Sequence, residues 1–195
     1  MRIATVLAAA SILALAACAD TEPVTNYVDV AANEVSLDNM AMTANDTASL
    51  TPAISFTSGD GAALGSASLE DGAAGLVISL AGTGMPPGSH GIHIHMVGKC
   101  DGPKFESAGA HWNPENKQHG TGNPAGAHKG DLPNVTVAAD GSLSETLTVT
   151  GASMAELRDS DGSALVVHAQ PDDNKTDPSG NSGDRIACAV IAPAS

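Results

Sequence analysis

The sequence predicts an all-β protein, an antiparallel sandwich or barrel with long loops. Short apolar runs alternate with Gly, Asn and Asp turn signals, as is typical of antiparallel strands. Gly occupies 21 positions and Pro 11, which disfavours long helices. With one Trp, one Tyr and two Phe, the core has to be built from Ala, Val, Leu and Ile. The length of 195 residues fits one domain with appendages.

The first 17 residues predict a secretory signal peptide, because one Arg precedes a short apolar run. A membrane-spanning helix needs about 20 apolar residues, so this run is too short to span. It ends in Leu15-Ala16-Ala17-Cys18, which resembles the bacterial lipobox, where the cysteine is lipidated. The alternative is ordinary cleavage nearby that leaves Cys18 as a free thiol. We expect residues 18–47 to form a lipidated acidic tether and residues 48–195 the domain, in a membrane-anchored lipoprotein of the cell envelope or periplasm.

The strands are predicted in order along the rest of the chain. Residues 66–70 and 75–80 form a hairpin around Asp71-Gly72, and residues 135–137 and 143–149 form another around Asp140-Gly141. Three further strands are expected at residues 91–97, 164–169 and 185–192. Only residues 153–158 indicate a short helix. Short strands at this spacing are typical of sandwiches and barrels.

The charge distribution excludes one class of partner. A net charge of −14 repels nucleic-acid phosphates, and an aromatic content of 2% leaves few rings for base stacking. We therefore expect no nucleic-acid binding.

Two segments, residues 98–131 and 172–184, do not fit the strand pattern. Both are rich in Gly, Pro, Asn and charged residues. Long loops on a β scaffold usually carry function. If Cys18 carries lipid, Cys100 and Cys188 remain as one pair for an oxidising compartment.

The histidines are the strongest chemical signal, and all seven lie between His90 and His168. His93 and His95 are two residues apart, so on a strand both side chains point to one face while Ile92 and Ile94 point to the core. Two adjacent imidazoles on one face form half of a metal site. By the same parity, His90 points away and is expected to be structural or at the surface.

The long loop adds three histidines and a carboxylate: His111, His119, His128 and Asp131. A single loop histidine is usually a surface residue, but this combination indicates a metal that orders the loop. Parity does not decide the face of His168. Imidazole favours copper and zinc, whereas magnesium and calcium prefer oxygen ligands. Ligation by histidine alone favours copper, and a tetrahedron that includes Asp favours zinc.

Together these residues resemble the copper–zinc superoxide dismutase family, over roughly residues 51–192. The matching pieces are Gly91-Ile92-His93-Ile94-His95, Ser107-Ala108-Gly109-Ala110-His111-Trp112-Asn113-Pro114, His119, His128-Lys129-Gly130-Asp131-Leu132-Pro133-Asn134, Leu165-Val166-Val167-His168 and Gly183-Asp184-Arg185-Ile186-Ala187-Cys188. The short spacing between His95 and Cys100 resembles the exported bacterial branch.

The resemblance implies an eight-stranded antiparallel Greek-key β-barrel with long metal-binding and electrostatic loops. It implies dismutation of superoxide to O2 and hydrogen peroxide, which would protect the cell envelope from external superoxide. The implied copper ligands are His93, His95, His111 and His168. The implied zinc ligands are His111, His119, His128 and Asp131, with the His111 imidazole bridging both metals.

The resemblance also implies roles around the metals. Asp172 would link a copper ligand to a zinc ligand, Arg185 would receive the anion beside copper, and Cys100 and Cys188 would form a disulfide. A homodimer is compatible with the resemblance.

The sequence departs from the family pattern at Met96, where an acid is common, and at Asp184, which should weaken the positive potential of Arg185. Lys175 and Thr176 resemble the steering pair but lie farther from Arg185 than expected. The alternative function is a non-enzymatic periplasmic copper- and zinc-binding module on the same fold.

Overall fold

A computed structural model describes residues 52–195 of the chain. The predicted signal peptide at residues 1–17, the lipidation site Cys18 and the tether at residues 18–47 lie outside the described residues. Within residues 52–195, no helix is long and apolar enough to cross a membrane.

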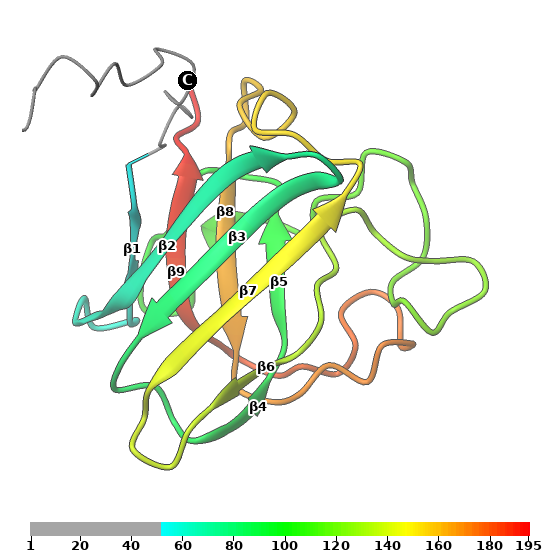
Figure 1. The fold of residues 1–195 in the computed structure, drawn as a ribbon. Coiled ribbons are helices and arrows are strands. Elements are labelled where there is room, and N and C mark those ends of the chain that lie inside the picture. Colours follow the sequence, from blue (N-terminus) through cyan, green and yellow to red (C-terminus); the bar gives the residue numbers. More distant parts are fainter. Residues whose placement is uncertain (1–51) are drawn as a thin grey trace, which may run out of the picture. The chain divides into compact units, whose positions relative to one another are not determined.

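Antiparallel strands make up nearly all the regular structure of the described residues, and one short 3-10 helix lies at Glu106–Ala108 (Figure 1). They are β1 (Ile54–Thr57), β2 (Ala63–Gly72), β3 (Gly75–Gly82), β4 (Gly88–His90), β5 (Ile92–His95), β6 (Val135–Val137), β7 (Leu143–Thr150), β8 (Ser163–His168) and β9 (Arg185–Ala192). Seven strands form one sheet in the order β5-β8-β9-β1-β2-β3-β7, and β4 pairs with β6 in a second sheet. The prediction of an all-β antiparallel fold is confirmed.

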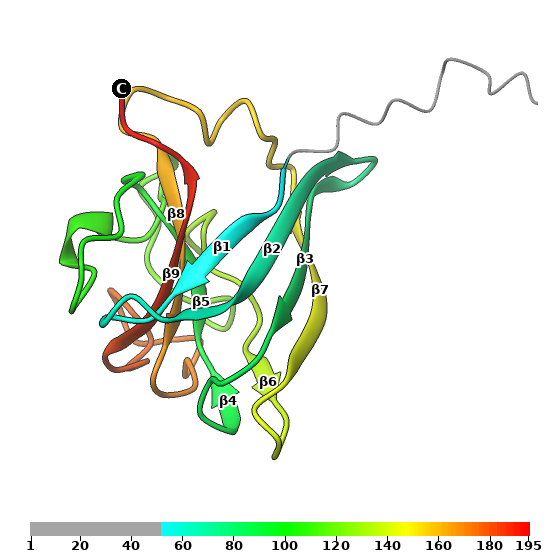
Figure 2. The same ribbon diagram turned by 90° about the vertical axis from the view of Figure 1, so that its left-hand side faces the viewer.

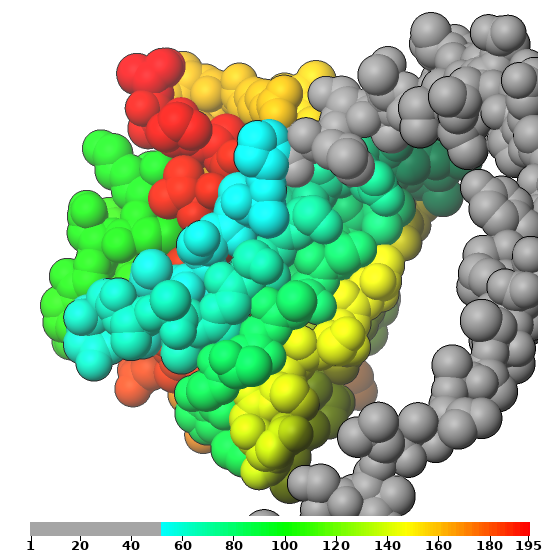
Figure 3. Space-filling view, turned by 60° about the vertical axis from the view of Figure 1, so that its left-hand side comes forward, coloured from blue at the N-terminus to red at the C-terminus, as the bar shows by residue number. Residues whose placement is uncertain are grey.

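The large sheet is curved, as the side view in Figure 2 shows, and it encloses an apolar core. The strands β1, β2, β3 and β7 run side by side as the cyan, green and yellow bands of Figure 3. Their inward side chains meet those of β5, β8 and β9 in one cluster of mainly aliphatic residues, as predicted. Ile92 and Ile94 are fully buried in this cluster, so the alternate residues His93 and His95 project from the opposite face of β5.

Three local predictions need correction. The strand predicted at 91–97 covers only Ile92–His95 (β5). Gly91 separates it from β4, because His90 pairs with β6 whereas Ile92 pairs with β8, so the chain changes sheets there. The first hairpin turns after Gly72, which pairs with Gly75, and not at Asp71-Gly72. The segment predicted as a helix at 153–158 forms only a turn at residues 154–157, because it is too short to propagate a helix.

The long loop is held against the free edge of β5. The Ile94 amide donates to the Gly130 carbonyl, and the Trp112 amide donates to the Ile94 carbonyl. Isolated bridges join His93 to Asp131 and His95 to His111. A Cβ at Gly130 would come within 2.4 Å of the Ile94 oxygen, so this close approach requires glycine. The loop thereby places His111 and Asp131 beside the strand histidines.

Candidate metal centre

Four buried histidines from three parts of the fold converge on one point. They are His93 and His95 on β5, His111 in the long loop and His168 at the end of β8, and their ring nitrogens lie within 4.8 Å of one another. The His93 ring stacks on the His111 ring with the centroids 3.9 Å apart. The structure therefore brings together all four predicted copper ligands, including His168, whose orientation the strand parity did not decide.

Each of these rings leaves one nitrogen without a protein partner. His95 directs its Nδ1 to the Gly109 carbonyl oxygen at 2.9 Å, and His168 directs its Nδ1 to the Gly183 oxygen at 3.2 Å. The remaining buried nitrogens form no hydrogen bond: His93 Nδ1, His95 Nε2, His111 Nε2 and His168 Nε2. A buried polar atom without a partner is costly, and four that converge are the expected lining of a metal site.

Burial keeps the imidazoles of His95, His111 and His168 neutral in the absence of metal. It lowers the pKa of His95 to about 2 and the pKa of His168 to about 3, and in both cases a neighbouring histidine lowers the pKa further. Burial lowers the pKa of His111 to about 4, although the hydrogen bond to Asp131 opposes the shift. Neutral imidazoles are the form that binds transition metals. We call this set the four-imidazole group.

A second group surrounds the Asp131 carboxylate. Its Oδ1 lies 3.0 Å from His111 Nδ1, 2.9 Å from His119 Nδ1 and 3.3 Å from His128 Nδ1. Atoms bound to a tetrahedral zinc at about 2.0–2.2 Å would lie about 3.3–3.5 Å apart, so a small expansion would admit the ion. We call this set, which contains the four predicted zinc ligands, the carboxylate group.

The electrostatics of the carboxylate group differ from those of the four-imidazole group. Burial opposes ionisation of Asp131, but hydrogen bonds from His111 and His119 hold the pKa of Asp131 well below its usual range. Burial lowers the pKa of His119, yet its hydrogen bonds to Asp131 and Asp172 outweigh burial and raise it to about 9.

Distance alone would place His93 in this second set instead of His128. Chemistry favours His128, because His93 already directs its Nε2 to Asp172 and its Nδ1 to the four-imidazole group. The Nδ1 of His128 is buried and has no hydrogen-bond partner.

Asp172 lies between the two groups. Its Oδ2 is 2.7 Å from His93 Nε2, and its Oδ1 is 3.0 Å from His119 Nε2. Gly180 closes over this carboxylate with φ of 62°, and a Cβ there would overlap the Asp172 Oδ1 atom. The predicted link between the two ligand sets is thus present, and Gly180 is a requirement that the sequence pattern did not indicate.

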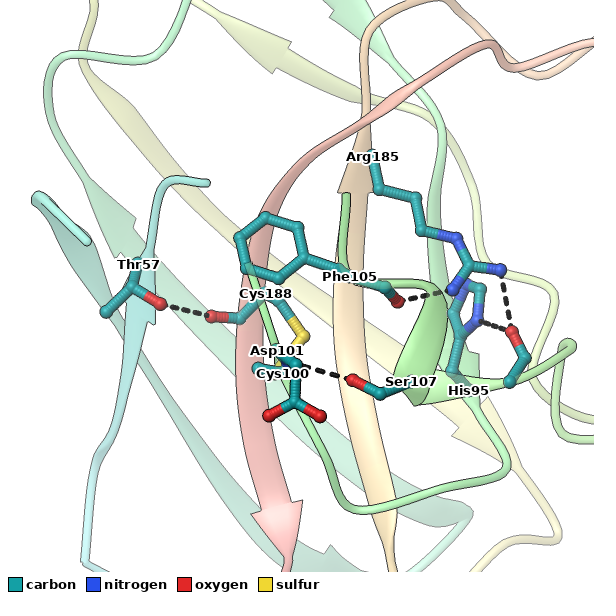
Figure 4. The surroundings of a disulfide bond; sticks show 9 residues. Thr57, His95, Cys100, Asp101, Phe105, Ser107, Arg185 and Cys188 are labelled. Atoms are coloured by element: carbon teal, nitrogen blue, oxygen red, sulfur yellow. Dashed lines mark hydrogen bonds between the residues drawn. A yellow bond between two sulfur atoms is a disulfide. The ribbon is translucent and has the colours of Figure 1, made fainter. Parts of the chain in front are cut away.

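Arg185 lies next to the four-imidazole group, in register with His168 across β8 and β9. Its guanidinium donates to the carbonyl oxygens of Phe105 and Gly109, each at 2.6 Å, and Gly109 also accepts from His95 (Figure 4). Five donors in a rigid fork are thereby fixed in one orientation.

Arg185 opens onto a surface depression of about 470 Å³. Lys104 contributes a second cation to its wall, while Glu106 and Asp184 contribute carboxylates. The predicted steering residues Lys175 and Thr176 do not line it. The Thr176 hydroxyl instead donates to Asp173, within the loop that contains both residues. Lys104 was missed because no motif marks it, and only the folded loop places it beside Arg185.

The predicted disulfide joins Cys100 to Cys188, 88 residues apart in sequence (Figure 4). Cys188 is on β9, and Cys100 is in the loop that also supplies the Phe105 and Gly109 carbonyls for Arg185. Cys188 lies in a small apolar cluster with Phe105 and Val166. The bond therefore fixes the Arg185 side of the site to the sheet.

His90 is buried as expected of a structural residue. Its Nδ1 lies 2.8 Å from the His168 carbonyl oxygen, and its Nε2 lies 2.8 Å from the Pro86 oxygen. It supports the backbone of His168 and does not join either ligand group.

Comparisons with known proteins agree with this geometry. A family model described as "Copper/zinc superoxide dismutase (SODC)" matches residues 63–191. Superoxide dismutase (Cu-Zn) 1 of Aquifex aeolicus (strain VF5) is 42% identical over 137 residues, which cover 67% of this chain and 81% of that relative.

A second relative, the superoxide dismutase-like protein YojM of Bacillus subtilis (strain 168), is 46% identical over 123 residues, which cover 60% of this chain and 63% of YojM. A crystal structure of a double mutant of a SOD-like protein from Bacillus subtilis is 41% identical, with a TM-score of 0.71. The aligned region covers 73% of this chain and 98% of the chain in that structure. In that mutant, histidines replace a tyrosine and a proline.

Proposed function

Because the chain belongs to the copper/zinc superoxide dismutase family, an oxidoreductase family whose cofactors are copper and zinc, we propose that copper binds at the four-imidazole group and zinc at the carboxylate group. The chain would convert superoxide to O2 and hydrogen peroxide there. The donor types support this assignment: a set of imidazoles suits copper, and imidazoles with one carboxylate suit tetrahedral zinc.

The observation that carries the proposal is the placement of His111. Its Nδ1 faces the carboxylate group, 3.0 Å from Asp131, while its unpartnered Nε2 faces the four-imidazole group. One ring can therefore join both metals, and we propose that it does. A binding module would need the ligands but would have no need for a shared ring beside a fixed arginine.

When bound, copper supplies one-electron redox chemistry by alternating between Cu(II) and Cu(I). The residues of this chain bind the anion, hold a proton and orient the ligand rings. Arg185, held by two carbonyl oxygens, attracts superoxide and orients it beside His95. The Nε2 of His111 would hold a proton destined for the peroxide product when it is not bound to copper. Asp172 fixes the ring orientations of His93 and His119 through hydrogen bonds, the usual role of a carboxylate behind a metal ligand.

Superoxide decay tests this function against the alternative of a metal-binding module. The full chain loaded with both metals should consume superoxide at a second-order rate of about 10⁸–10⁹ M⁻¹ s⁻¹. Arg185→Ala should lower this rate at equal copper and zinc content, and Glu70→Gln, on the exposed side of β2, should not. If both metals are bound and the decay is no faster than in buffer, the module interpretation is correct.

We also propose that residues 1–17 direct export and that lipid on Cys18 anchors the protein in the cell envelope, where it removes external superoxide. The support is the apolar run and the small residues before Cys18. Metabolic labelling with a radioactive fatty acid should mark the wild-type protein and leave Cys18→Ser unlabelled. Equal labelling of both would contradict the anchor.

A further inference from the structure

A cavity of about 490 Å³ lies beside the metal centre, separate from the depression that contains Arg185. Two proposed zinc ligands, His111 and His128, line it. The His128 Nδ1, on the side of the carboxylate group, is buried and has no hydrogen-bond partner. The cavity therefore extends from the surface to two side chains of the carboxylate group, one of which, His128, has an unpartnered ring nitrogen.

The outer wall of this cavity is acidic. Asp159, Asp161 and Asp177 contribute carboxylates to it from two separate loops. Its one lysine, Lys117, is paired with Glu115 at 2.6 Å, so its charge is offset. Within residues 52–195, none of the three aspartates forms an ion pair with a lysine or arginine. The field in this cavity attracts cations and repels an anion such as superoxide.

From this arrangement we infer that the acidic cavity is the route by which zinc ions reach the carboxylate group, while the anion enters beside Arg185. The inference rests on the proposed zinc ligands. Asp177 connects the wall to the ligands: its Oδ1 accepts the His119 amide and lies 3.8 Å from His128 Nε2. Carboxylates at the surface followed by imidazoles at the inner wall form a graded series of zinc-binding groups.

Asp159 and Asp161 are the residues to change. Asp159 accepts the amides of Asp161 and Gly162 through Oδ1, an atom that asparagine retains. In the described structure the Asp161 carboxylate has no hydrogen-bond or ion-pair partner, so its replacement should leave the fold intact. Glu70→Gln is the matched control, since it removes one exposed carboxylate from β2, outside the cavity.

The test follows zinc uptake by the metal-free, disulfide-bonded full chain in a stopped-flow instrument, with a chromogenic zinc indicator. At low ionic strength, Asp161→Asn should take up zinc about threefold more slowly than the wild type, and the double variant Asp159→Asn/Asp161→Asn about tenfold more slowly. Added salt should slow the wild type more than the double variant, because screening removes the same attraction. Glu70→Gln should match the wild type.

The inference is overturned if the double variant takes up zinc at the wild-type rate, or if Glu70→Gln slows uptake equally. A wild-type rate that does not change with salt also overturns it. The zinc stoichiometry at equilibrium distinguishes a failure of the proposed route from a failure of the proposed zinc ligands. A chain that binds one zinc at unaltered rates overturns the route alone, whereas a chain that binds none overturns the ligand assignment as well.

Discussion

The two ligand groups share one histidine ring and are built in opposite ways. The four-imidazole group contains no carboxylate, and burial holds the pKa values of His95 and His168 at about 2 and about 3. The carboxylate group contains a buried Asp131, and the hydrogen bonds of His119 to Asp131 and Asp172 raise the pKa of His119 to about 9. Without metal, His95, His111 and His168 are neutral, whereas His119 and Asp131 carry paired charges.

The long loop thus contributes His111 to two metal sites of different chemistry, which the strands β5 and β8 complete on one side and the loop itself on the other. A neutral set of imidazoles lets the charge of the bound ion change by one without breaking an ion pair, as a redox metal requires. A carboxylate among imidazoles offsets part of a fixed divalent charge, which suits zinc, an ion with no redox chemistry. His111, between them, should therefore matter more than any residue that belongs to one group alone.

The largest effect is expected from His111→Ala. It removes a ligand from both groups, so superoxide decay should slow by about a thousandfold, several kcal/mol of lost stabilisation. His128→Ala removes a ligand from the carboxylate group only and should cost less activity at equal copper content. Equal losses in the two variants, with copper retained in both, would contradict the shared role of His111.

The disulfide should distinguish the two sides of the site. The double variant Cys100→Ser/Cys188→Ser should lose about 2–5 kcal/mol of unfolding free energy, because the unfolded chain regains the conformational freedom of the long segment that the disulfide closes. The bond fixes the loop that holds Arg185, so activity per copper should fall more than zinc content. Chemical unfolding and metal analysis measure both. Zinc loss without a fall in activity per copper would show that the disulfide supports the carboxylate group and not the loop that holds Arg185.

Asp172 should affect the carboxylate group through ring orientation. Asp172→Asn keeps the shape but weakens the acceptor for His93 and His119, so zinc affinity should fall by about tenfold to a hundredfold. The control Asp101→Asn removes an exposed carboxylate that contacts neither group. Competition against a zinc chelator measures the affinity. Identical affinity for Asp172→Asn and the wild type would show that the link is dispensable.

The smallest effect concerns the anion side. Lys104→Gln should lower the superoxide rate about twofold at low ionic strength, and the difference should shrink as salt screens it. Lys175→Gln should change the rate less, because Lys175 does not line the depression beside Arg185. Pulse radiolysis at several salt concentrations measures both. A larger effect from Lys175 would restore it as the steering residue.

The sequence was sufficient where chemistry follows local spacing. Alternation along β5 placed His93 and His95 on one face, and the composition of the 98–131 loop indicated a metal. It was insufficient where contacts are made across the fold. Lys104 lines the same depression as Arg185 only after the disulfide loop is folded. Gly180 is required only because Asp172 lies beneath it, and the chain changes sheets at Gly91 because its neighbours pair with different strands.

The most direct test of the account is anomalous diffraction from crystals of the full chain loaded with copper and zinc, recorded at both absorption edges. We predict a copper peak among His93, His95, His111 and His168 and a zinc peak beside Asp131, with the His111 ring between the two. Zinc in the four-imidazole group, or a His111 ring that contacts a single metal, would contradict the account.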